Sequence, residues 1–173
     1  MKNLSLIFSI LALLSVSAHA QKRPVKPSKK AVVKKAVKAI PRRKFDPLRD
    51  PAADLASAME TATKSGKRII LDVGGEWCGW CVYMDKFLYL NKPLTKFRDD
   101  NYVWIKINMS EENENKRFLS AFPEITGYPH LFVLDETGKL LHSQDTAVLE
   151  KGEGYDLKKF TKFLTTWSLK KSL

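Results

Sequence analysis

The sequence predicts an α/β fold in which a central mixed β-sheet is flanked by helices. Short apolar segments typical of buried strands alternate with segments of helical periodicity, and this order produces parallel strands joined by helices. A turn between two later strand segments predicts an antiparallel hairpin, and an amphipathic helix closes the chain. About 130 residues follow the N-terminal segments, which is enough for one such core.

The first half of the predicted domain contains a helix, a strand and a second helix. Residues 51–64 read as a helix, because Asp50 is a suitable N-cap and Gly66 lies just beyond the end. Residues 68–73 include an apolar run, as in a strand that is covered on both faces. Residues 78–90 show the helical spacing of apolar side chains.

The second half adds three helical segments and three strands. The helical segments are residues 93–100, 113–122 and 155–169. The strand segments are residues 102–109, 131–135 and 139–143. The turn Glu136-Thr137-Gly138 joins the last two strands, so we expect them to pair as a hairpin.

Residues 1–20 read as a cleaved signal peptide. Lys2 supplies a positive charge, residues 4–16 form an apolar stretch, and Ala18-His19-Ala20 has the small-x-small pattern of a cleavage site. An uncleaved membrane anchor is the alternative, but the apolar stretch is shorter than the roughly 20 residues that span a bilayer. We therefore expect the protein to be secreted across the inner membrane into the periplasm.

Residues 21–44 are expected to form a basic, largely disordered linker before a folded domain at residues 45–173. Of the chain's 30 Lys and Arg residues, eleven lie in this linker and Lys2 lies in the signal peptide, which leaves 18 to face all 19 Asp and Glu residues. The domain has no excess of positive charge, so we expect no nucleic-acid partner. Residues 22–44 could contact an anionic membrane surface through a weak basic amphipathic helix, or act only as a solvated tether.

The chain's two cysteines, Cys78 and Cys81, lie three positions apart. A bridge between them closes almost no loop and stabilises little, so redox chemistry or metal binding explains the pair better. Cys78 is expected at the N-terminal end of a helix, where free amide N–H groups and the helix dipole favour a thiolate. Cys81, one helical turn later, could then attack a mixed disulfide formed on Cys78.

Residues 68–88, RIILDVGGEWCGWCVYMDKFL, resemble thioredoxin in their order of strand, loop, Trp-Cys-Gly-x-Cys and helix. The resemblance covers roughly residues 45–173 and implies a thioredoxin-like fold. It also implies a thiol–disulfide oxidoreductase that needs no organic cofactor and no metal. Trp77, Gly79 and Trp80 would then lie around the redox thiols, on the side that meets the substrate.

The resemblance also implies a role for Asp72, which lies six residues before Cys78. Thioredoxin has a buried aspartate at this place relative to its cysteines. Burial favours the neutral form of a carboxyl, so such a group can accept the proton of Cys81 near neutral pH, directly or through a water. Lys106 resembles the family lysine that neighbours this aspartate. The alternatives are a strand-end acid and a strand lysine that both face solvent.

The sequence Gly127-Tyr128-Pro129 resembles the family loop that carries a cis-proline opposite the cysteines. The Tyr128 backbone would then be free to pair with an extended substrate segment, and Tyr128 and His130 would border the site. Two residues depart from the thioredoxin pattern, since Trp80 replaces the usual proline and His130 replaces the usual threonine. Trp80 suits either a substrate contact or packing.

We expect the protein to reduce protein disulfides, with a membrane thiol donor supplying electrons in the oxidising periplasm. An isomerase or oxidase of the same fold is an alternative, because the residues between the cysteines influence the reduction potential. A non-catalytic thioredoxin-like binding module is another. In a metal-binding module, Cys78, Cys81, His130 and His142 would hold zinc or copper, although this spacing matches no compact zinc finger.

Overall fold

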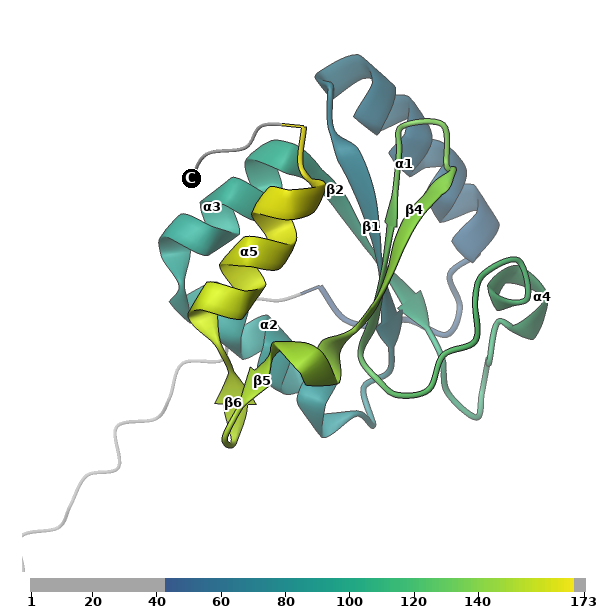
Figure 1. Cartoon of the computed structure of the whole chain (residues 1–173). Coiled ribbons are helices and arrows are strands. Elements are labelled where there is room, and N and C mark those ends of the chain that lie inside the picture. The colour runs from purple at the N-terminus through teal and green to yellow at the C-terminus, as the bar shows by residue number, and fades with distance from the viewer. Residues whose placement is uncertain (1–42, 170–173) are drawn as a thin grey trace, which may run out of the picture. The chain divides into compact units, whose positions relative to one another are not determined.

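The computed structural model describes residues 43–169, which contain a four-stranded sheet in the order β2-β1-β3-β4 (Figure 1). The strands are β1 (Arg68–Gly74), β2 (Tyr102–Asn108), β3 (His130–Leu134) and β4 (Leu140–Asp145). β1 runs parallel to β2 and antiparallel to β3, and β3 runs antiparallel to β4. The predicted mixed sheet and the hairpin are therefore confirmed.

Helices cover both faces of this sheet (Figure 1). They are α1 (Pro51–Ser65), α2 (Gly79–Leu90), α3 (Lys92–Asn101), α4 (Lys116–Leu119) and α5 (Leu157–Trp167). α2, α3 and α5 lie on one side of the sheet, and α1 and the single turn α4 lie on the other. The sheet is thus the middle of three layers, as predicted.

The alternation of side chains along β1 divides the core into two clusters. Ile70 packs with Met84 in the cluster between the sheet and helices α2, α3 and α5. Ile69 packs with Ala62 in the cluster beneath α1. Because successive side chains of a strand point to opposite faces, Asp72 shares its face with Ile70 and lies on the α2 side of the sheet.

The two predicted ends of α1 are confirmed. The side chain of Asp50 accepts hydrogen bonds from the amide N–H groups of Ala52 and Ala53, at 2.9 and 3.3 Å. Gly66 follows the helix in the left-handed conformation, with φ of 60°. Its own amide N–H donates to the carbonyl of Ala62, which closes the last turn.

The helix predicted at residues 113–122 is wrong in length, because α4 occupies only Lys116–Leu119. Asn115 adopts a left-handed conformation with φ of 49°, which a helix cannot continue through. Its amide N–H donates to the side chain of Asn113, so the polar turn replaces the first helical turn.

The closing helix also starts later than predicted. A 3-10 turn (Thr146–Leu149) and a small hairpin of β5 (Glu150–Lys151) and β6 (Gly154–Tyr155) precede it. α5 then begins after its N-cap, Asp156, whose carboxylate accepts from the free amide N–H groups of Lys158 and Lys159 in the first turn.

Two expectations lie outside the described residues: the signal peptide at residues 1–20 and almost all of the linker at residues 21–44. Within residues 43–169, none of the helices has both the length and the apolar character needed to span a membrane.

Replacing Asp50 tests the start of α1. Asp50→Ala should lower the free energy of unfolding by about 1 kcal/mol, because two amide N–H groups lose their acceptor. Asp50→Asn should keep most of the stability, since asparagine caps helices about as well. Urea denaturation of the three proteins measures the difference. An equal loss in both variants would show that charge, rather than hydrogen bonding, stabilises this end.

Candidate active site

Cys78 and Cys81 are joined by a disulfide at the start of α2. Cys78 is the N-cap of the helix, and its Sγ accepts a hydrogen bond from the amide N–H of Cys81 at 3.1 Å. In the reduced protein, this N–H and the helix dipole would favour a thiolate at Cys78. Cys78 is 4% exposed and Cys81 is fully buried, so both residues are buried and Cys78 retains slightly more access to solvent.

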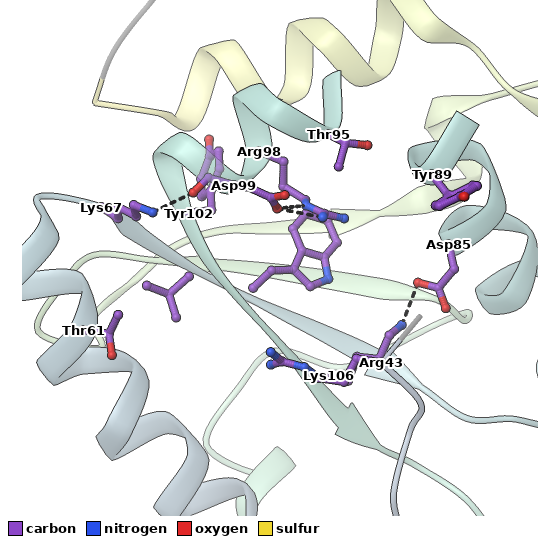
Figure 2. Close-up of a pocket in the computed structure, with 12 residues that line it drawn as sticks. Arg43, Thr61, Lys67, Asp85, Tyr89, Thr95, Arg98, Asp99, Tyr102 and Lys106 are labelled. Atoms are coloured by element: carbon purple, nitrogen blue, oxygen red, sulfur yellow. Dashed lines mark hydrogen bonds and ion pairs between the residues drawn. The ribbon is translucent and has the colours of Figure 1, made fainter. Parts of the chain in front are cut away.

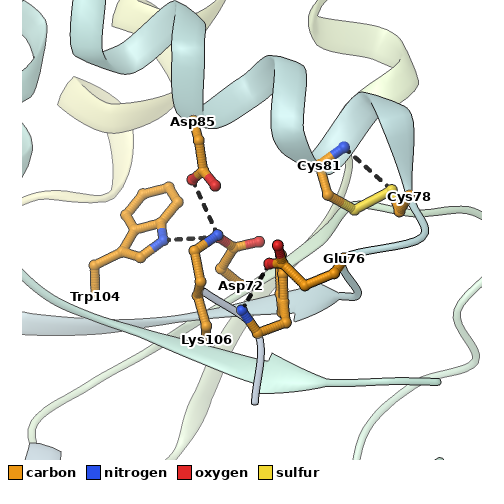
Figure 3. Close-up of polar contacts among 8 residues, drawn as sticks. Asp72, Glu76, Cys78, Cys81, Asp85, Trp104 and Lys106 are labelled. Atoms are coloured by element: carbon orange, nitrogen blue, oxygen red, sulfur yellow. Dashed lines mark hydrogen bonds and ion pairs between the residues drawn. A yellow bond between two sulfur atoms is a disulfide. The ribbon is translucent and has the colours of Figure 1, made fainter. Parts of the chain in front are cut away.

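Asp72 is fully buried near the end of β1. Its Oδ2 accepts hydrogen bonds from the indole N–H of Trp104 at 3.1 Å and from Nζ of Lys106 at 2.8 Å (Figure 3). Its Oδ1 is also buried and accepts no hydrogen bond within the described part of the chain. The solvent-facing alternative for Asp72 is therefore wrong, and one carboxylate oxygen is left that can take a proton.

Lys106 is buried too, and two carboxylates share its ammonium group. Nζ lies 2.8 Å from Oδ2 of Asp72 and 3.0 Å from Oδ1 of Asp85. This contradicts the exposed-lysine alternative and places Lys106 beside Asp72, as the resemblance implies. The ammonium of Lys106 thus bridges a carboxylate of β1 and a carboxylate of α2.

Sequence reasoning missed four residues around this cluster, namely Phe45, Glu76, Asp85 and Trp104. Two of them carry a local signal. Asp85 lies four residues after Cys81 and therefore on the same side of its helix, and Trp104 lies two residues before Lys106 and on the same side of its strand. Phe45 and Glu76 carry none, because their contacts join segments 31 residues apart.

Trp77 and Tyr128 form an aromatic border next to the disulfide. Trp77 is 59% exposed, and its indole N–H donates to the carbonyl of Met109 at 2.7 Å. The Trp77 and Tyr128 rings meet edge to face, with centroids 5.6 Å apart. The peptide bond between Tyr128 and Pro129 is cis, which confirms that prediction. Burial raises the pKa of the Tyr128 phenol, and the charge of Glu114 raises it further, so this side chain stays neutral.

Trp80 and His130 pack within the protein. Trp80 is half-buried and meets the ring of Tyr155 edge to face at 5.5 Å, which favours the packing alternative. The expected position of His130 at the border needs correction, because its side chain is only 3% exposed. Its Nε2 lies 2.8 Å from Oγ of Ser143, and its ring leans on Phe132 in the layer beneath α1. Burial lowers the pKa of His130, which favours the neutral imidazole.

A glycine at the end of β1 allows the close approach of the disulfide. A Cβ atom at Gly74 would lie 2.5 Å from Sγ of Cys81 and 3.1 Å from the ring of Phe45. Gly79 begins α2 and is exposed, and a Cβ atom there would have no neighbour within 4 Å. Position 74 therefore requires glycine for packing, whereas position 79 does not.

A cavity of about 470 Å³ adjoins the ion pairs beside the edge strand β2 (Figure 2). Asp85, Trp104 and Lys106 line it, together with Arg43 at the start of the described chain. Figure 2 shows the ion pair between Lys106 and Asp85 at its border. The cavity brings the otherwise buried cluster close to solvent at a place removed from the aromatic border of Trp77 and Tyr128.

The four residues considered as metal ligands do not gather into a site. Among residues 43–169, no three His, Cys, Asp or Glu side chains are placed to hold a metal ion. His142 instead stacks on the ring of Trp167, with centroids 4.4 Å apart.

The sequence profile of a family described as thioredoxin-like matches residues 50–136, about half of the chain. The chain belongs to the thioredoxin-like family. The matched range contains both cysteines, Asp72 and Lys106, whereas Phe45 and α5 lie outside it.

Curated relatives match parts of this thioredoxin-like chain. It is 27% identical over 96 residues to the thiol:disulfide interchange protein DsbD of Colwellia psychrerythraea. This match covers 54% of this chain and 16% of that protein. The chain is 26% identical over 94 residues to the disulfide bond reductase DsbH of Chlamydia pneumoniae, which covers 50% and 57% respectively. The matches thus cover less than two thirds of either relative.

Solved structures of other proteins share the fold. A disulphide isomerase from Xylella fastidiosa Temecula1 superposes with a TM-score of 0.61 at 19% identity, over 70% of this chain and 94% of that one. The reduced C-terminal domain of DsbD from Neisseria meningitidis gives a TM-score of 0.50 at 21% identity, over 67% and 96%.

The packing at position 74 can be tested with a matched pair of glycine substitutions. Gly74→Ala should lower the free energy of unfolding by about 1–3 kcal/mol, because the added methyl group overlaps Sγ of Cys81. Gly79→Ala should not lower the free energy of unfolding, because the added methyl group points into open space and alanine favours a helix. Urea denaturation of the oxidised proteins compares them. If Gly74→Ala is as stable as the parent, the close approach does not constrain the site.

Proposed function

We propose that this protein is a thiol–disulfide oxidoreductase that reduces protein disulfides in the periplasm. The observation that carries the proposal is the Cys78–Cys81 disulfide at the N-terminus of α2, with the buried Asp72 on the sheet beneath. The disulfide chemistry in the names of the two curated relatives supports the same reaction class.

The first proposed step is attack by the Cys78 thiolate on a substrate disulfide. The substrate S–S bond breaks, one substrate sulfur leaves as a thiolate, and a mixed disulfide forms on Cys78. Trp77 and Tyr128 form the aromatic border that would contact the substrate, with Pro129 and Gly79 beside it. The substrate backbone would pair with Tyr128 as an added strand.

The second proposed step is resolution by Cys81. Asp72 takes the proton of the Cys81 thiol, directly or through a water, and the thiolate attacks Sγ of Cys78. The Cys78–Cys81 disulfide forms and the second substrate sulfur leaves. The substrate gains two electrons, and the two cysteines lose them. The single proton of Cys81 passes to Asp72 and then to solvent, and the two released substrate thiolates take up protons from water. Lys106 supports this step by holding the Asp72 carboxylate in place.

Continued turnover needs an external dithiol, because the periplasm is kept oxidising. We infer that a membrane thiol donor reduces the Cys78–Cys81 disulfide. In this proposal, residues 1–20 direct export and residues 21–44 connect to the domain at residues 45–173. Isomerisation or oxidation would use the same two thiols, and the reduction potential measured against glutathione separates these directions.

Single cysteine variants test the assignment of the two thiols. Cys81→Ser should trap mixed disulfides with substrates, because the resolving thiol is missing. Cys78→Ser should trap few or none, because Cys81 is fully buried. Diagonal gels of periplasmic extracts from cells that make each variant show the trapped species. Equal trapping by both variants would contradict the assignment.

The role of Asp72 is tested by the rate of resolution. Asp72→Asn should slow the decay of the mixed disulfide at least about tenfold, because the proton acceptor is lost, while the alkylation rate of Cys78 changes little. Asp85→Asn is the comparison, because it also removes a carboxylate from Lys106 but leaves Asp72 in place. If both variants slow the decay equally, the charge balance around Lys106, and not proton acceptance by Asp72, controls the step.

A further inference from the structure

Residues 43–50, called here the N-terminal segment, contain one buried side chain. Phe45 is 3% exposed, whereas Lys44 and Asp46 on either side are exposed and Leu48 is 93% exposed. A large aromatic residue buried alone in an exposed segment has a specific packing partner. For Phe45, this partner is the redox disulfide.

The ring of Phe45 and the buried sulfur of the pair border the same space. Phe45 forms a cluster of buried residues with Cys78 and Cys81. A Cβ atom at Gly74 would meet both the ring, at 3.1 Å, and Sγ of Cys81, at 2.5 Å. The absence of a side chain at Gly74 therefore leaves one space that the ring and the sulfur share.

The same ring covers the ammonium group beneath the site. Nζ of Lys106 lies 3.9 Å from the centroid of the Phe45 ring while it pairs with Asp72 and Asp85. A cation over an aromatic face is attracted to it, most strongly where water is excluded. One side chain thus covers both the resolving thiol and the cation that holds its proposed proton acceptor.

Contacts to separate parts of the domain hold the N-terminal segment in place. The amide N–H of Phe45 donates to Oε1 of Glu76 at 3.0 Å. The carbonyl of Pro47 accepts from Nδ2 of Asn113 at 2.8 Å, and Arg49 pairs with Asp54 in α1. The ring is therefore fixed from the loop before the cysteines and from the loop after β2.

We propose that Phe45 is a positioning residue of the redox centre, which closes the side of Cys81 that faces away from the substrate. Cys81 then reacts with Sγ of Cys78 in the mixed disulfide but not with thiol reagents or disulfides in solution. The benefit to turnover rests on the proposed function. The closure itself rests only on the cluster of Phe45 with the two cysteines, on the space that its ring shares with Sγ of Cys81 at Gly74, and on its contact with Lys106.

The test measures access to Cys81 in the full chain carrying Cys78→Ser, where Cys81 is the only thiol. Addition of Phe45→Ala should raise its rate of alkylation by iodoacetamide at least about tenfold, because the cover is removed. Phe45→Leu should restore a rate within about twofold of the parent, since leucine refills most of the space. Leu48→Ala, in the same segment but exposed, should leave the rate unchanged.

A second control separates local access from general loss of stability. Leu134→Ala removes a fully buried side chain from the core beneath α1, away from the N-terminal segment. It should lower the urea midpoint of unfolding, because it leaves a cavity in the core, and leave the alkylation rate close to that of the parent under native conditions. The proposal is overturned if Phe45→Ala does not accelerate alkylation, if Phe45→Leu fails to restore protection, or if Leu134→Ala accelerates it equally.

This experiment and the trapping experiment fail independently. Alkylation of Cys81 reports the closure whether or not the protein reduces protein disulfides. Trapping by Cys81→Ser reports the reaction whether or not Phe45 controls access. If Cys81 is protected but no substrate is trapped, the closure stands and the proposed reductase activity is contradicted. If substrates are trapped but Cys81 is not protected by Phe45, the reductase activity stands and the closure is contradicted.

Discussion

The buried ammonium of Lys106 makes the centre of this fold stable. Asp72 is buried on a face of the sheet where the neighbouring strand residues have apolar side chains. An unpaired carboxylate there would cost several kcal/mol. Lys106 and the indole of Trp104 offset this cost by donating to Oδ2. Asp85 shares the ammonium from α2, so one cation joins β1, β2 and the helix that carries the cysteines.

This arrangement explains why the disulfide lies where it does. The register of β1 and β2 sets Asp72 directly beside Lys106, and both side chains therefore face α2. Cys81 and Asp85 are four residues apart on the inner side of that helix, so the ion pair and the sulfur are placed by the same packing. The glycine at the end of β1 then lets Cys81 come against the sheet without a side chain between them.

Local sequence signals predicted the parts of the fold that depend on neighbouring residues. The caps of α1 follow from Asp50 and Gly66, and the cysteine pair and the cis-proline follow from short motifs that resemble thioredoxin. The helix at residues 113–122 failed, because asparagine side chains bonded to the local backbone and outweighed helical spacing. His130 was misplaced for a different reason, since its motif position did not specify which face of β3 its side chain occupies.

Composition alone could not show how the N-terminal segment joins the domain. The excess of lysine and arginine up to Lys44 predicts a tether that ends there, and the sequence gives Phe45 no role beyond that of the first residue of the domain. Its amide N–H, however, is bonded to Glu76, and its ring lies on Lys106 and the cysteine cluster. A chain cut directly before Phe45 would place a new ammonium group beside Glu76 and the ion pairs. The folded unit is therefore best defined with Phe45 in an intact peptide bond, because this residue is also part of the redox site.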